Sequence, residues 1–206
     1  MSLALASAAV IGPVEFVSRL DGDLARPAIP QAPEPLPDEE PEAFEARAEA
    51  FRLELVAFAE STQAFERRLK AARETQAWAD VLKPDASPTV FVCRQIPWRQ
   101  WERWCSVRAY HNLSTTEAAG TLIRMALTEI RGGGWPATFK VPAPVEHMLP
   151  DPQNRAVTKP TGLGKIAPVS MLEQLAEILQ DGDLAGDVIE DIGTQIHAHR
   201  MQAPGN

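Results

Sequence analysis

The chain has 206 residues, of which 45% are apolar, and a formal net charge of −8. This apolar content is enough to build a packed core, which excludes an outright disordered chain. The acidic balance opposes general binding to nucleic acid or anionic membrane, because the summed field repels phosphates, although a local basic patch can override it. Cys93 and Cys105 fit no zinc-site or disulfide-scaffold spacing, so we expect buried thiols in a reducing compartment.

The first 26 residues are expected to form an arm or one or two short strands. The initial twelve are apolar, yet they lack the positive segment of a secretory signal and are too short to span a bilayer, which predicts a cytoplasmic protein. An N-terminus that touches lipid is the alternative. Residues 27–41 contain six prolines and end in acidic residues, which favours an extended polyproline linker.

Residues 42–82 carry the strongest periodic signal and predict a long amphipathic helix. Apolar residues recur at spacings of three and four, as in a heptad seam, and the other faces are rich in charged residues. This seam either packs on the protein's own core or offers its phenylalanines to a helix of a partner. Its members are Phe44, Ala48, Phe51, Leu55, Phe58, Thr62, Phe65, Leu69 and Ala72.

A strand and a helix are predicted next. Residues 83–88 contain two prolines and end the long helix, and residues 89–96 are β-branched and aromatic, which predicts a strand. Pro97 suits the first turn of a helix over residues 98–110. This helix carries three tryptophans, which serve either as core anchors or as an interface or base-stacking surface: Trp98, Trp101 and Trp104.

The remaining chain is expected to be helical except for one long loop. Ser114 and Glu117 match a capping box at the start of a helix over residues 115–131, and three glycines follow it. Residues 135–168 are rich in proline and glycine, which predicts a loop with a short strand near residues 138–141. Helices over residues 169–180 and 184–199 are expected to form a C-terminal hairpin within 169–200, followed by a tail over 201–206.

These elements predict a mainly α fold with one short strand or small β element. The helical core is expected within residues 42–134, between the proline-rich linker and the loop. The helical hairpin would then form the C-terminal part.

Motifs with catalytic or ligand-binding chemistry are incomplete in this sequence. Thr161–Lys165 resembles a phosphate loop, but it lacks the earlier glycine and has Ile166 in place of Ser or Thr. The aspartates that begin at Asp181 lack the further oxygen ligands of a calcium loop, and His197 and His199 lack a third metal ligand. We therefore expect no catalytic residue, no metal, no cofactor and no enzyme activity.

Residues 89–131 have the strand, helix, helix order of a ribbon-helix-helix DNA-binding fold. That fold pairs strands from two chains and inserts their outward side chains into the major groove. The local charge of +3 supports this alternative, a DNA-binding transcriptional regulator. The alternation of side chains along the strand argues against it. That alternation places Phe91, Cys93 and Gln95 outward, and these are poor donors for reading bases.

The same segment in wider context resembles the tail assembly chaperones of long-tailed phages. The strand, the Ile96-Pro97 step and the following Trp101 come directly after a charged helix, as they do in that family. Residues 20–24 (LDGDL) are similar to an early motif of the family, and residues 179–183 (LQDGD) lie near the end of the chain.

The resemblance implies a non-enzymatic chaperone that binds the tape measure protein and prevents its aggregation during tail assembly. It also implies the major tail tube protein as a second partner, a longer form made by ribosomal frameshifting, a location in the host cytoplasm and absence from the mature virion. Self-association is expected, because many copies would coat one client. We predict that client contact involves the apolar and aromatic residues Phe51, Leu55, Phe58, Phe65, Trp98, Trp101 and Trp104.

Overall fold

The computed structural model describes residues 13–37, 40–75, 77–133, 135–136, 139–179 and 182–202, except for the side chains of 182–184 and 201–202. The chain divides into two compact units. Unit 1 consists of Met1–Gly22 together with Ser87–Asn206, and unit 2 consists of Asp23–Ala86. The predicted helical core over residues 42–134 is thus shared between two units.

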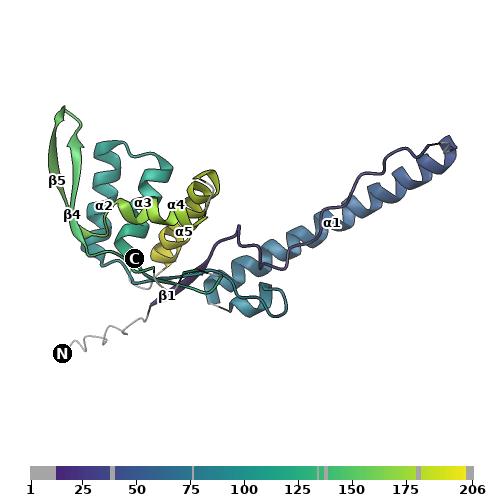
Figure 1. Ribbon diagram of the computed structural model, residues 1–206, viewed down its shortest axis with the longest axis horizontal. Helices are drawn as coiled ribbons and strands as arrows, with labels where there is room; N and C mark the ends of the chain where they lie inside the picture. Colours follow the sequence, from purple (N-terminus) through teal and green to yellow (C-terminus); the bar gives the residue numbers. More distant parts are fainter. Residues whose placement is uncertain are drawn as a thin grey trace, which may run out of the picture. The chain divides into compact units, whose positions relative to one another are not determined.

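Unit 2 consists of one long helix and an extended arm (Figure 1). The helix α1 spans Pro41–Thr75, so the predicted helix over residues 42–82 is confirmed in its main part but ends earlier, and a short 3-10 helix, η1, spans Trp78–Val81. A β-bridge between Leu24 and Leu82 closes the base of the unit. The chain before Leu24 and the chain after Leu82 are therefore held together where the arm begins.

Unit 1 contains a three-stranded antiparallel sheet in the order β1-β2-β3. Its strands are β1 (Val14–Val17), β2 (Val90–Cys93) and β3 (Leu127–Arg131). Both faces of β2 are buried, since Phe91, Val92 and Cys93 are all less than 5% exposed. The predicted strand is therefore confirmed at its centre, but none of these three side chains points into solvent.

Four helices complete unit 1, and one face of the sheet joins their common core. These are α2 (Trp98–His111), α3 (Thr115–Ala126), α4 (Ser170–Leu179) and α5 (Gly182–Gln202). The predicted capping box at Ser114 and Glu117 is confirmed. Helices α3 and α5 cross closely, because a Cβ atom at Gly193 would lie 2.5 Å from the Cβ atom of Ala119. Only glycine permits this crossing.

A second sheet is the antiparallel hairpin of β4 (Val145–Asp151) and β5 (Asn154–Ile166). It stands beside α2 (Figure 1). The side-chain amide of Gln100 on α2 donates to the carbonyl of Leu163 on β5 at 2.9 Å. The base of the hairpin is thus fixed to the helical part of unit 1, whereas every residue from Pro152 to Pro160 is exposed.

The prediction of a mainly α fold is wrong. Of the residues that the structure describes, 51% are helical, but five strands in two antiparallel sheets hold 20%, which makes the fold mixed α/β. The predicted helix over 115–131 ends at Ala126, and β3 follows at once. Most of the predicted loop over 135–168 is the β4–β5 hairpin. The short strand predicted near residues 138–141 is not found over 139–141, and Thr138 lies outside the described residues.

Two further properties follow from the described residues. Cys93 and Cys105 are both unpaired thiols, but Cys105 is exposed, so the expectation of two buried thiols is wrong for it. Burial raises the pKa of the Cys93 thiol to about 12. Among the helices that the structure describes, none is both long and apolar enough to cross a membrane.

Candidate functional site

Helix α1 keeps much of its apolar surface at the exterior of the protein. Over its 35 residues, only Phe65, Leu69 and Ala72 are buried. Leu55 is 41% exposed, whereas Phe51 and Phe58 are half-buried. Of the four residues of this helix that we expected to contact a partner, Leu55 is the most accessible and Phe65 is not accessible.

The proline-rich arm runs beside α1 in the opposite chain direction (Figure 1). The guanidinium of Arg47 donates to the carbonyl of Glu34 at 2.9 Å, and the amide of Ala25 donates to the carbonyl of Val81. Between these two anchors, Pro27, Pro30 and Pro33 are half-buried, while the residues separating them are exposed. One face of the arm therefore lies on the helix.

The arm and the seam match in their axial repeat. A polyproline helix turns once in three residues, or about 9 Å, and seven residues of an α-helix rise about 10 Å. Prolines three residues apart therefore stay nearly in step with phenylalanines seven residues apart, such as Phe44, Phe51 and Phe58. The match is compatible with the half-buried state of all three phenylalanines.

Two large apolar side chains of α1 lie away from the seam and from the arm. Leu53 is 67% exposed and Val56 is 59% exposed. They are three residues apart and so neighbour each other on the helix surface. Sequence reasoning missed this pair, because it selected only residues in phase with the heptad. Their sequence signal is that they are large aliphatic residues at positions where the heptad predicts polar ones.

The three tryptophans of α2 have different environments. Trp101 and Trp104 are 3% and 2% exposed and stack with their ring centroids 4.9 Å apart. His197 of α5 lies 5.1 Å from the Trp101 ring. Trp98 is 47% exposed, and the guanidinium of Arg200 lies over its ring. Trp101 and Trp104 thus serve as core anchors, and only Trp98 is accessible to a partner.

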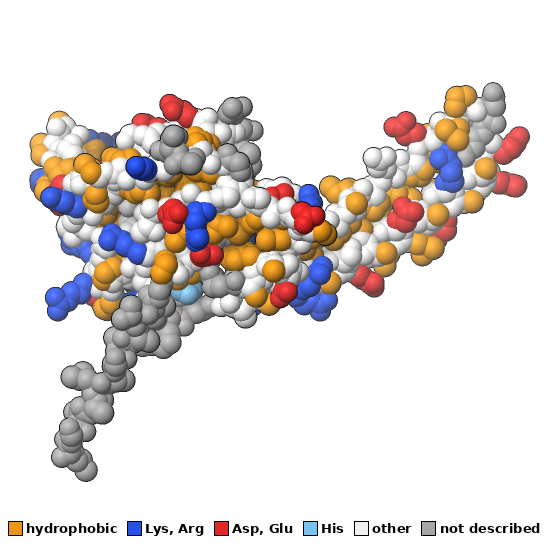
Figure 2. Space-filling view, turned by 60° about the horizontal axis from the view of Figure 1, so that its bottom comes forward, with side chains coloured by type: hydrophobic (Ala, Val, Ile, Leu, Met, Phe, Trp, Pro, Cys, Tyr) orange, Lys and Arg blue, Asp and Glu red, His pale blue; other side chains and the backbone are white. Residues whose placement is uncertain are grey.

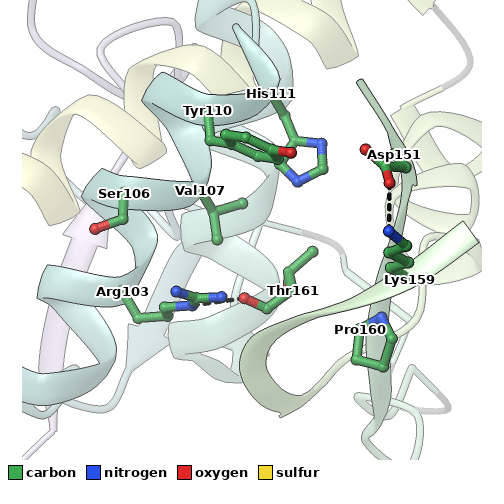
Figure 3. Close-up of a pocket in the computed structure, with 9 residues that line it drawn as sticks. All are labelled: Arg103, Ser106, Val107, Tyr110, His111, Asp151, Lys159, Pro160 and Thr161. Carbon is green, nitrogen blue, oxygen red and sulfur yellow. Dashed lines mark hydrogen bonds and ion pairs between the residues drawn. The ribbon is translucent and has the colours of Figure 1, made fainter. Parts of the chain in front are cut away.

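A pocket of about 330 Å³ lies between α2 and the β4–β5 hairpin (Figure 3). Tyr110 and His111 on the helix face the ion pair of Lys159 with Asp151, whose N–O distance is 2.5 Å. This ion pair lowers the pKa of Asp151 and raises that of Lys159. Arg103 closes another side of the pocket and donates from Nε to the carbonyl of Thr161 at 2.6 Å.

A buried histidine supports the wall of this pocket. His147 on β4 is 2% exposed, and its Nδ1 lies 2.8 Å from the hydroxyl of Thr161 on β5. That hydroxyl donates to the His147 carbonyl, so the Nδ1–H of the histidine is the donor in the shorter bond. Burial, followed by the charges of Arg124 and His111, lowers the pKa of His147 to about 4. The ring is therefore neutral at physiological pH.

The pocket has the chemistry of a binding site for an anion. Arg103, Tyr110 and Lys159 present hydrogen-bond donors, and the only lining carboxylate is already paired with Lys159. The hydroxyl of Ser106 donates to the Glu102 carbonyl of its own helix, so it is not activated by a base. Among the described residues, no cluster of three His, Cys, Asp or Glu side chains has the geometry of a metal site.

Comparisons with known proteins give no match. No protein-family model, curated protein or solved structure is significantly similar to this chain.

The sheet of unit 1 also bears on the DNA-binding alternative. A ribbon-helix-helix protein needs a strand with an open edge, because that strand pairs with its copy in a second chain. Here β2 pairs with β1 on one edge and with β3 on the other. The strand that would form the ribbon thus has both edges occupied within its own chain. The glycines of the phosphate-loop-like segment, Gly162 and Gly164, lie within β5.

Proposed function

We propose that this protein is a non-enzymatic phage tail assembly chaperone that binds the tape measure protein and prevents its aggregation. The observation that carries the proposal is the exposure of Leu53 and Val56 on a 35-residue helix. The resemblance of residues 89–104 to the family supports it from the sequence. The client is proposed to contact Leu53, Leu55 and Val56 first.

The chemistry of this surface suits a helical client. Aliphatic side chains at helical spacing pair with the apolar stripe of another helix, in the manner of a coiled coil or a helix in a groove. A tape measure protein is a very long helical chain, and its apolar stripes remain exposed until tail tube subunits enclose it. Covering such stripes requires burial of apolar surface alone, so the proposed activity needs no nucleotide.

The acidic charge of the helix adds solubility to this role. The segment 34–60 holds nine acidic residues and two basic ones. A client coated with this helix would carry a high negative charge, and like-charged complexes repel one another. The proposed location is the host cytoplasm, with the major tail tube protein as a second partner and no chaperone in the finished virion.

A co-expression experiment tests the proposal. The tagged chain is produced together with the long helical tail protein encoded nearest to it, the lysate is treated with nuclease, and the soluble client is quantified after affinity capture. The unmodified chain should keep the client soluble and co-purify with it. The double variant Leu53→Asp/Val56→Asp should lose at least about tenfold of the captured client, because two charges enter an apolar contact.

The matched control places the same substitution at exposed valines of unit 1. Val145 and Val169 are 47% and 53% exposed, so Val145→Asp/Val169→Asp adds the same charge outside α1 and should capture the client normally. Circular dichroism should show both double variants folded. Equal capture by the two variants would reject α1 as the client surface. Recovery of DNA but of no protein, once nuclease is omitted, would support the DNA-binding alternative.

A further inference from the structure

Charge is strongly segregated along this chain. Residues 34–60 carry a net charge of −7, whereas residues 87–168 hold ten basic and five acidic residues, a net charge of +5. The overall charge of −8 conceals this division. Two patches of opposite charge on one chain allow electrostatic attraction between copies of that chain.

Positive charge is concentrated on α2 and on β5 of the hairpin. Arg99 and Arg103 lie one turn apart on α2, and Arg155, Lys159 and Lys165 lie on β5; all five residues are exposed. We call these five residues the basic face. Figure 2 shows Lys and Arg side chains over the end of unit 1 that carries the hairpin. Within the described part of the chain, Arg99, Arg155 and Lys165 form no ion pair.

The negative charge gathers on the first part of α1. Glu40, Glu42, Glu45 and Glu49 are exposed; we call them the acidic tip. Glu49 pairs with Arg52, but Glu42 and Glu45 have no cationic partner among the described residues. These carboxylates are acceptors only, whereas the pocket that includes Arg103 and Lys159 of the basic face offers donors, and its one lining carboxylate, Asp151, is paired with Lys159. The two surfaces are therefore complementary in hydrogen bonding as well as in charge.

We propose that the basic face binds the acidic tip of α1 from a second copy of this chain, so that copies associate head to tail. The pocket lined by Arg103, Tyr110 and Lys159 takes one glutamate carboxylate of the incoming helix. Because each copy offers one acidic tip and one basic face, the contact is heterologous and builds either a closed ring or an open row of copies. This inference goes beyond the proposed function and does not depend on the identity of the client.

Sedimentation velocity of the full chain over a range of protein and salt concentrations tests the proposal. The chain should associate reversibly at low salt and dissociate towards about 1 M salt, where the Debye length is only about 3 Å. Arg99→Glu/Arg155→Glu and Glu42→Arg/Glu45→Arg should each weaken self-association about tenfold or more, because attraction becomes repulsion. Mixing the two variants should restore association, because each then offers one patch that complements the other.

Two matched controls separate the contact from a simple effect of net charge. Arg67→Glu/Lys70→Glu reverses two exposed cations of α1 outside the basic face, and Glu173→Arg/Glu177→Arg reverses two exposed acids of α4. Both controls should associate like the unmodified chain. A chain that stays monomeric at every concentration, or controls that weaken association equally, would overturn the proposal. Unchanged self-association of the Arg99→Glu/Arg155→Glu variant, with loss of binding to a duplex DNA probe, would assign the basic face to nucleic acid instead.

Discussion

The guanidinium of Arg103 lies directly against Gly162, where a Cβ atom would be only 2.7 Å from Nε of the arginine. Gly162 also has a φ of +79°, in the left-handed region that side chains rarely adopt. This close approach lets Arg103 bond to the Thr161 carbonyl and holds its charge at the pocket. The backbone at Gly162 therefore helps to form the pocket, because it leaves room for the Arg103 side chain.

Gly162→Ala should destabilise the protein more than Gly164→Ala. Both glycines have a positive φ, but a Cβ atom at Gly164 meets nothing within 4 Å. Both variants therefore suffer backbone strain of about 1 kcal/mol, and only Gly162→Ala must also displace Arg103. Urea unfolding measures the difference. Equal losses of unfolding free energy would mean that Arg103 moves aside without cost.

Asp191→Ala should cost about 3 kcal/mol of unfolding free energy, because it leaves buried donors without an acceptor. The carboxylate of Asp191 accepts hydrogen bonds from the hydroxyl of Ser18, the amide of Arg19 and the side chain of Gln195, at 2.7 to 3.2 Å. It thereby fixes α5 to the segment that follows β1. Asp187→Ala, at an exposed position of the same helix, should change stability by less than about 0.5 kcal/mol.

His147 should make the protein less stable in acid. The pKa of this ring is about 4 in the folded chain, below the ordinary value of 6.5. Between these two values the unfolded chain binds more protons, so stability should fall as the pH drops from about 6.5 to about 4 and then stop responding to this group.

Thermal unfolding across that pH range measures the contribution of His147. The variant His147→Gln keeps a hydrogen-bonding side chain but does not titrate, so its melting temperature should depend less on pH than that of the unmodified chain. Since carboxylates titrate in both proteins, the difference between the two curves isolates the histidine. Parallel curves would show that His147 has the same pKa folded and unfolded.

Loosening the proline-rich arm should expose the seam of α1. Pro30→Gly/Pro33→Gly removes two half-buried rings and adds backbone freedom to the unfolded arm. Binding of an apolar fluorescent dye should therefore increase. The control Pro35→Gly/Pro37→Gly removes two exposed prolines of the same segment and should leave dye binding nearly unchanged. A similar increase of dye binding in both variants would mean that the half-buried prolines, which are spaced three residues apart, do not specifically cover the seam.

Elements whose signals are local could be predicted from the sequence. The heptad of apolar residues predicted α1, because helix periodicity needs no information from the rest of the chain. Ser114 and Glu117 predicted the start of α3 for the same reason, since a capping box forms within four residues. The boundaries of α2, predicted at residues 98 and 110, are also close to those observed.

The strands and the accessibility of side chains depended on contacts between distant segments. Leu127 and Ile130 fit the helical period of α3. Their segment forms the strand β3 instead, because its backbone pairs with β2. The prolines and glycines of the β4–β5 hairpin led to the prediction of a loop. The hairpin forms because β4 pairs with β5 and the pair contacts α2.

The same holds for the candidate sites. Leu53 and Trp101 are both large apolar residues on predicted helices, and only packing makes the first 67% exposed and the second 3% exposed. The pocket joins Arg103 to Thr161 across 58 positions of the sequence. Local periodicity fixes which residues share a helix face, but burial is a property of the whole fold. Which of these faces a partner can reach therefore depends on tertiary packing.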